Sequence, residues 1–167
     1  MIMFERFGNL DSAEAINRVA AEIKATGDEE KLKAFCEENG IDKEDAEDYM
    51  DDHLDELVTP LSAALGKLRA EEKFLKLGGI LTDWVDELRN ECINDEKMQQ
   101  AVRSSSKELA GYIAALAENG YENRCVVSPV IVKQAKTISK LVGGHEFSIG
   151  VPDKATRLQL MKNYYLS

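Results

Sequence analysis

Hydrophobic residues recur three and four positions apart along most of the chain, the spacing that places side chains on one face of an α-helix. Polar residues that start helices, and Asn-Gly or Gly-Gly pairs that end them, separate these periodic segments. The expected helices begin at or just after Asp11, Asp28, Asp42, Thr59-Pro60, Gly78-Gly79, Asp95, Ser104–Ser106, Ser128-Pro129 and Pro152-Asp153. We therefore predict a largely helical protein.

One segment departs from the helical spacing. Near 145–151, Phe147, Ile149 and Val151 occupy alternate positions, as in a short extended strand. The pattern predicts an all-α or nearly all-α fold: a compact multi-helix bundle of about seven to nine helices, with at most one strand-like segment near 145–151.

The length of 167 residues fits one domain, and we expect residues 1–167 to form a single helical domain. Gly78-Gly79 is the best candidate for a hinge between two halves. These halves are an acidic helical half, 1–77, and a helical half, 80–167, whose C-terminal part is basic.

The distribution of charge adds to this picture, because nearly all of the net negative charge lies in one segment of the chain. Residues 28–56 hold 14 Asp and Glu against three Lys, a net charge of −11, whereas the whole chain has a formal net charge of −10. From Tyr121 onward, three acidic and seven basic residues give +4. A molecule polarised in this way interacts differently with charged partners at its two ends.

The helix expected over 42–57 contains nine of these carboxylates. Its apolar stripe should face the core, with Tyr49 and Met50 as anchors, and its carboxylates should face outward. The stripe comprises Ala46, Tyr49, Met50, His53, Leu54 and Leu57. On this helix His53 is interpreted as a core or boundary histidine, hydrogen-bonded to a neighbour.

The acidic run does not have the pattern of a metal or catalytic site. A calcium loop needs glycine at its sixth position, which counted from Asp42 is Glu47. Carboxylates on the wet face of a helix lack the burial that shifts catalytic pKa values. The cysteines, Cys36, Cys92 and Cys125, form no closely spaced pair typical of zinc ligands. We expect no catalytic residues, no metal site and no cofactor.

The acidic face is then either a solvated surface or an interface for a basic partner. Asp45, Asp48, Asp52 and Asp55 would form one row about 15 Å long on a continuous helix. Their spacing approaches that of phosphates along a nucleic-acid strand. The partner-binding set we predict is Glu44, Asp45, Asp48, Asp51, Asp52, Asp55 and Glu56.

A second candidate surface is basic. Lys133, Lys136 and Lys140 recur at helical spacing in the segment that follows Pro129. They could contact phosphates, although nucleic-acid-binding domains usually have a positive overall charge. Solvated lysines, or lysines that pair with the acidic half of a second copy, are the alternatives, so a homodimer is compatible with the sequence.

Two stretches resemble small acidic proteins carried by conjugative elements and prophages of Gram-positive gut bacteria. They are FGNLDSAEAINRVAA at 7–21 and ENGIDKEDAEDYMDDHLDELVTPLSAALGKL at 38–68. The similarity continues through the helix around Trp84 and to the C-terminal Gly-Val-Pro and Tyr-Tyr-Leu. Mobile elements of this kind also carry anti-CRISPR and other anti-defence proteins, some of which are acidic DNA mimics. The resemblance implies this setting and transfers no functional residue.

Together these patterns predict a non-enzymatic inhibitor whose acidic helical face imitates nucleic acid and blocks a basic nucleic-acid-binding protein, such as a CRISPR effector nuclease. The alternative is a DNA-binding or regulatory accessory protein of a mobile element that acts through the Lys133–Lys140 face. The third possible function is that of an enzyme without a recognisable motif. No apolar run approaches the roughly 20 residues of a membrane helix, and the N-terminal stretch lacks a signal-peptide core, so we expect a cytoplasmic protein with reduced thiols.

Overall fold

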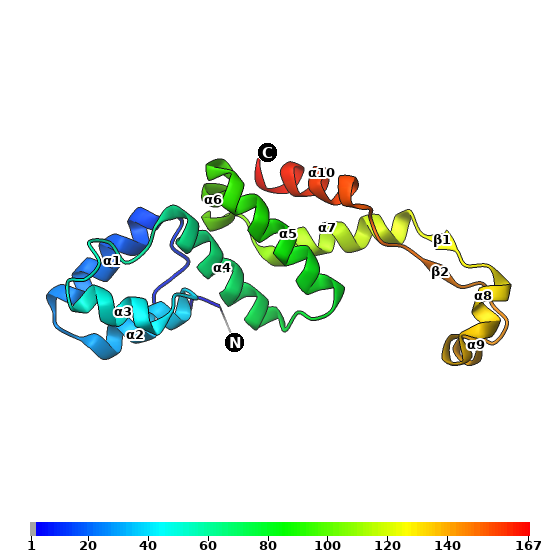
Figure 1. The fold of residues 1–167 in the computed structure, drawn as a ribbon, viewed down its shortest axis with the longest axis horizontal. Helices are drawn as coiled ribbons and strands as arrows, with labels where there is room; N and C mark the ends of the chain where they lie inside the picture. The colour runs from blue at the N-terminus through cyan, green and yellow to red at the C-terminus, as the bar shows by residue number, and fades with distance from the viewer. Residues whose placement is uncertain (1–2) are drawn as a thin grey trace.

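Helix α4 (Pro60–Leu75) lies at the centre of the molecule, with other helices packed on both sides of it (Figure 1). The computed structural model describes residues 3–167. Helices α1, α2 and α3 form one end of the molecule, and α5, α6, α7 and α10 pack together on the other side of α4. A narrow arm continues from this second group and ends in α8 and α9. The molecule is therefore elongated, with its acidic N-terminal helices and its arm at opposite ends.

The elements follow the chain in a simple order. The helices are α1 (Ala13–Ala25), α2 (Glu29–Glu38), α3 (Lys43–Met50), α4 (Pro60–Leu75), α5 (Ile80–Asn94), α6 (Glu96–Arg103), α7 (Leu109–Glu122), α8 (Pro129–Gln134), α9 (Lys136–Val142) and α10 (Lys154–Tyr165). Two strands, β1 (Cys125–Val126) and β2 (Ser148–Ile149), form an antiparallel pair in which Cys125 lies opposite Ile149.

Two hydrophobic clusters meet along α4. The first is built from α1 to α3 and includes Ala63, and the second is built from α5, α6, α7 and α10 and includes Ala64. Adjacent residues of a helix point about 100° apart, so α4 contributes to both clusters at once. The change from one cluster to the other lies inside this continuous helix. Gly78-Gly79, our candidate hinge, lies in the turn between α4 and α5, two helices that pack against each other.

Glycine allows α4 to approach the end of α2 closely. A Cβ atom at Gly66 would lie 2.6 Å from the carbonyl oxygen of Asn39, and one at Gly40 would lie 2.1 Å from the carbonyl oxygen of Gly66. Gly40 also has a positive φ of 66°, a conformation that glycine adopts at little cost. The sequence pattern Asn39-Gly40 therefore ends α2 and also brings the backbone of the acidic segment against α4.

The second cluster contains a buried ion pair. The side chain of Lys67 is fully buried, and its Nζ donates hydrogen bonds of 2.5 Å to the carbonyl oxygens of Ser104 and Lys107. Glu71, one turn later, accepts a 3.2 Å hydrogen bond from the backbone N–H of Leu109. Burial lowers the pKa of Lys67 to about 8 and raises the pKa of Glu71 to about 7. The pair holds backbone groups at the end of α6 and the start of α7 that the helices themselves leave unpaired.

The arm, residues 123–151, is the strand pair with α8 and α9 at its tip. Its root is fixed where the returning chain crosses α7: a Cβ atom at Gly150 would lie 1.6 Å from the carbonyl oxygen of Gly120. Beyond this crossing the arm has little core of its own, since Val132 is the buried residue of α8 and α9 has none. The arm is thus attached firmly at its base and covered poorly at its tip.

The predicted fold class is confirmed, with corrections to individual elements. Ten helices are present in residues 3–167 because the helix expected over 129–142 is broken at Ala135 into α8 and α9. The extended segment near 145–151 pairs with β1, which is too short to show alternation in the sequence. Helix α1 is capped by Ser12 and not by Asp11. Cys36 and Cys92 are buried, as expected for small hydrophobic residues, and Cys125 is exposed.

We predict that Lys67→Met lowers the free energy of unfolding by about 3–5 kcal/mol, because it leaves Glu71 as an unpaired buried acid and removes the donor to two carbonyls. Urea unfolding followed by circular dichroism measures this change. Lys97→Met is the matched control: Lys97 is exposed and makes no ion pair in residues 3–167. Equal unfolding midpoints for the two variants would contradict a structural role for the buried pair.

Candidate interaction surfaces

The acidic segment does not form one helix from 42 to 57. Helix α3 ends at Met50, and Asp52 adopts a left-handed conformation with φ of 59°. Asp and Asn tolerate this conformation better than most residues. A longer helix would have collected further carboxylates at its C-terminal end, where the exposed carbonyls already carry partial negative charge. The chain therefore leaves the helix, and the single row of Asp45, Asp48, Asp52 and Asp55 that we predicted is wrong.

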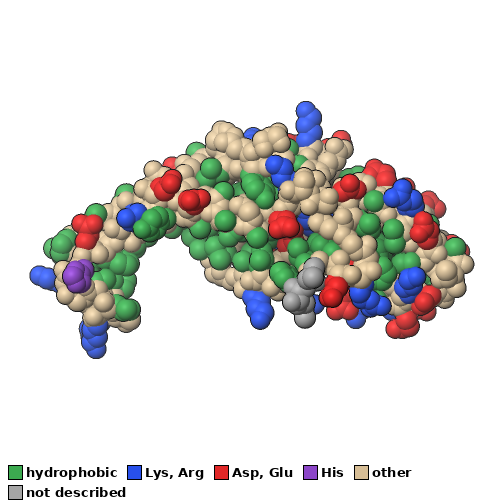
Figure 2. Space-filling model, turned by 180° about the vertical axis from the view of Figure 1, so that it is seen from behind, with side chains coloured by type: hydrophobic (Ala, Val, Ile, Leu, Met, Phe, Trp, Pro, Cys, Tyr) green, Lys and Arg blue, Asp and Glu red, His purple; other side chains and the backbone are tan. Residues whose placement is uncertain are grey.

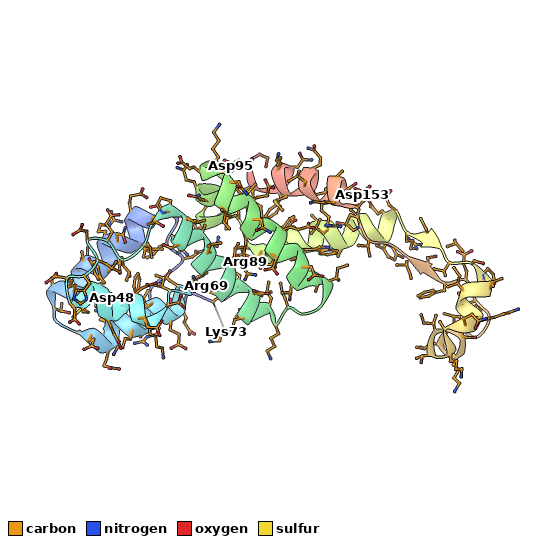
Figure 3. All side chains as sticks on the ribbon, viewed as in Figure 1. Asp48, Arg69, Lys73, Arg89, Asp95 and Asp153 are labelled. Carbon is orange, nitrogen blue, oxygen red and sulfur yellow. The ribbon has the colours of Figure 1, made fainter. Side chains whose placement is uncertain are left out.

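What the structure has instead is an acidic end, which we define as α3 together with the acidic loop, residues 51–56. Glu44, Asp45 and Asp48 lie on α3, whereas Asp51, Asp52, Asp55 and Glu56 lie on the loop. All are exposed except Asp45, which is half-buried. The seven predicted residues thus share one end of the molecule but lie on two elements, and Asp48 is seen at its outer edge in Figure 3.

Lys24, in the last turn of α1, holds the loop where it leaves α3. Its Nζ donates to the carbonyl oxygen of Tyr49, lies 2.6 Å from Asp52 Oδ1 and sits 4.5 Å from the centre of the Tyr49 ring. The hydrogen bond from Lys24 lowers the pKa of Asp52. Asp52 therefore serves to attach the loop to α1, and its charge is matched within the chain.

Other cations neutralise the inner side of the acidic helices. Lys33 pairs with Glu29 and Glu47, and Arg69 of α4 lies 2.9 Å from Asp42. Arg69 is on the side of α4 that faces α2 and α3 (Figure 3). Asp42 occupies the N-cap of α3 as predicted, but it makes no capping hydrogen bond because its carboxylate contacts Arg69. At this end acidic and basic side chains are interleaved, as Figure 2 shows.

Six predicted carboxylates remain without a lysine or arginine partner in residues 3–167. They are Glu44, Asp45, Asp48, Asp51, Asp55 and Glu56. Burial raises the pKa of Asp45, and the negative charges of Asp42 and Asp48 raise it further, although Arg69 acts in the opposite direction. Burial is the largest cause of the shift, and the contributions of Asp42 and Asp48 reflect the like charges nearby. Such a surface favours the approach of positive charge.

The residues that anchor α3 are where we predicted them, but His53 is not. Tyr49 is buried and Met50 packs against the first cluster. His53 lies after the end of the helix and is largely exposed, with its Nδ1 3.5 Å from Asp48 Oδ1. Its predicted place on the apolar stripe depended on a helix that stops three residues earlier.

The three lysines of the second candidate surface lie on the arm, divided between two helices. Lys133 belongs to α8, and Lys136 and Lys140 belong to α9, so their helical spacing does not correspond to one helix face. All three are exposed and form no ion pair in residues 3–167. The sequence analysis did not identify the exposed apolar residues near these lysines: Val130, Ile131 and Leu141 are all exposed.

Comparison with known proteins does not assign the chain to a family. No family model, curated protein or solved structure matches this chain. The resemblance to proteins of mobile elements stays a sequence-based expectation.

The groups with chemically unusual surroundings are inside the protein. Glu71, the buried carboxylate with the most clearly raised pKa, is 2% exposed and so has almost no contact with solvent. In the same residues no cluster of His, Cys, Asp and Glu has a composition suited to a metal ion, and no helix combines the length and apolar character required to cross a bilayer. Glu71 therefore contributes to packing in the observed geometry.

We predict that Lys24→Met loosens the acidic loop. The variant loses the ion pair to Asp52 and the hydrogen bond to the carbonyl oxygen of Tyr49, the two contacts through which α1 holds the loop. Limited proteolysis with a Glu-specific protease should cleave after Glu56 several times faster than in the unaltered protein. The control variant is Lys31→Met, which replaces an exposed lysine without an ion pair in the described chain. The protease should cleave it at the same rate as the unaltered protein. Equal rates for both variants would contradict this attachment.

Proposed function

We propose that the protein is a non-enzymatic binding protein whose acidic end occupies the basic, nucleic-acid-binding surface of a partner protein. A CRISPR effector nuclease, inhibited as by an anti-CRISPR protein, is the partner we put first. The observation that carries this proposal is the group of six carboxylates at the acidic end without a lysine or arginine partner in residues 3–167. Five of the six are exposed, and exposed carboxylates close to one another gain most from an external cation.

The contact we propose differs from the straight row expected from the sequence. Asp48 at the end of α3 and Asp51, Asp55 and Glu56 on the loop present charge around a turn of the chain. Phosphates in a binding groove are likewise contacted from several directions, mostly by Lys and Arg. Lys24 and Asp52 act in this proposal as positioning residues, because they hold the loop against α1.

The second candidate function is DNA binding through the arm, in a regulatory accessory protein of a mobile element. It is favoured by the projection of the arm from the body and by the exposed, unpaired Lys133, Lys136 and Lys140 in the described chain. The exposed apolar residues beside them speak against it, because interfaces with DNA are polar and strongly positive. A gel-shift assay with duplex DNA at low salt distinguishes the two functions, since the acidic-end proposal expects no retardation.

The test of the leading proposal is competition for target DNA. The protein should reduce the binding of labelled target DNA to a guide-loaded CRISPR effector nuclease at low salt. The triple variant Asp48→Asn/Asp51→Asn/Asp55→Asn should inhibit about tenfold less strongly, since three surface ion pairs at about 0.5 kcal/mol each give about 1.5 kcal/mol. The difference should shrink as salt is added, because these charges are exposed.

A second triple variant controls for net charge. Asp83→Asn/Glu96→Gln/Glu118→Gln also removes three exposed carboxylates, all outside the acidic end and without ion pairs in residues 3–167. It should inhibit as well as the unaltered protein. Equal loss in both triple variants would mean that only net charge matters. Full inhibition by the first variant, with its circular dichroism spectrum unchanged, would refute the proposed contact.

A further inference from the structure

The tip of the arm exposes apolar side chains to a degree that a solvated segment does not require. Val130, Ile131 and Leu141 are 70%, 61% and 81% exposed. On the strands beneath them, Val126 and Ile149 are also more than half exposed. An isolated two-stranded ribbon is only marginally stable in water, and an exposed apolar patch of this kind usually marks a binding site. The arm therefore has the composition of a docking element.

The concave side of the arm encloses a hollow of about 410 Å³. Its apolar lining includes Val126, Val132, Val142 and Phe147, and its polar lining includes Lys133, His145 and Glu146. Figure 2 shows hydrophobic side chains along this inner side and basic side chains near the tip. From Asn123 to Val151 the chain has four Lys or Arg and one Glu. The surface thus suits a segment that combines an apolar side chain with carboxylates.

The chain itself contains such a segment. In the acidic loop, Asp51 precedes Leu54 in the chain, and Asp55 and Glu56 follow it. Leu54 is half-buried: part of its side chain packs against the first hydrophobic cluster and the rest is exposed. These three carboxylates have no lysine or arginine partner in residues 3–167. Lys133, Lys136 and Lys140 of the arm likewise have no Asp or Glu partner in those residues. The acidic loop and the arm lie at opposite ends of the long axis (Figure 1), so they cannot meet within one chain.

We propose that a second copy of the chain covers the arm: the arm of each protomer receives the acidic loop of the other in a symmetric, antiparallel dimer. Two-fold symmetry allows both contacts to form at once, because each protomer supplies one arm and one loop. The lysines of the arm face Asp51, Asp55 and Glu56 of the second copy, and the exposed part of Leu54 of that copy contacts the apolar side chains of the arm. The dimer proposal does not depend on the proposed function. The dimer would, however, cover carboxylates of the acidic loop that the proposed partner also contacts.

Charge reversal tests this pairing with a compensating control. Sedimentation velocity at low salt should show a dimer of the unaltered protein that dissociates as salt is raised. Two variants, Lys133→Glu/Lys136→Glu/Lys140→Glu and Asp51→Lys/Asp55→Lys/Glu56→Lys, should each dimerise at least about tenfold more weakly, since like charges then face each other. Mixed together, they should form a heterodimer, because in that pair every arm meets a loop of opposite charge. Restoration on mixing also shows that both variants are folded.

The remaining outcomes identify another occupant and overturn the proposal. A monomer at all salt concentrations refutes the dimer. Dimerisation that survives both charge reversals but is lost in Ile131→Ser/Leu141→Ser means that the arms pair with each other through their apolar faces. Retardation of duplex DNA by a monomeric protein, abolished by the lysine variant, means that the arm binds nucleic acid. Failure of the dimer is distinguishable from failure of the proposed function, because the competition assay uses neutral substitutions and a different partner.

Discussion

The buried ammonium of Lys67 ties the central helix to the turn between α6 and α7, and much of the molecule is positioned through this contact. Glu71 binds the first N–H of α7, so the direction of α7 is set from α4. In the same turn, buried Arg103 donates to Asn39 Oδ1 at the end of α2. One polar cluster thus joins the two hydrophobic clusters. Removing one member of such a cluster is costly, because it leaves a buried charge without its partner.

This arrangement holds two charged regions apart. The close contact of Gly40 with Gly66 places the acidic end on one side of α4. The arm extends from the end of α7, where the returning chain crosses that helix at Gly150. Neither region can neutralise the other within one chain, because α4 and α7 separate them. Opposite charges at a fixed separation create a field that orients partners along the long axis. If a second copy takes the acidic loop, dimerisation and the binding of a basic partner exclude each other.

The acidic segment illustrates how tertiary contacts divide a run of like charges into different roles. Asp42 and Asp52 look alike in the sequence, yet each contacts a cation from another helix, Arg69 or Lys24. Asp48, Asp51 and Asp55 have no such partner in residues 3–167. Only the second group is available to another molecule. A charge count over residues 28–56 therefore overstates the charge that a partner would meet.

The sequence by itself determined most helices and their caps at Asp28, Thr59 and Asp153, because helical periodicity and capping depend on residues within a few positions of each other. It also located the acidic end and the basic arm. Only the tertiary structure decided that α3 stops at Met50, that Ala135 breaks the arm helix, and that Ile131 and Leu141 stay exposed. Ion pairs such as Lys24 with Asp52 join residues 28 positions apart, and no local pattern encodes them, because they exist only once the helices that carry them have packed.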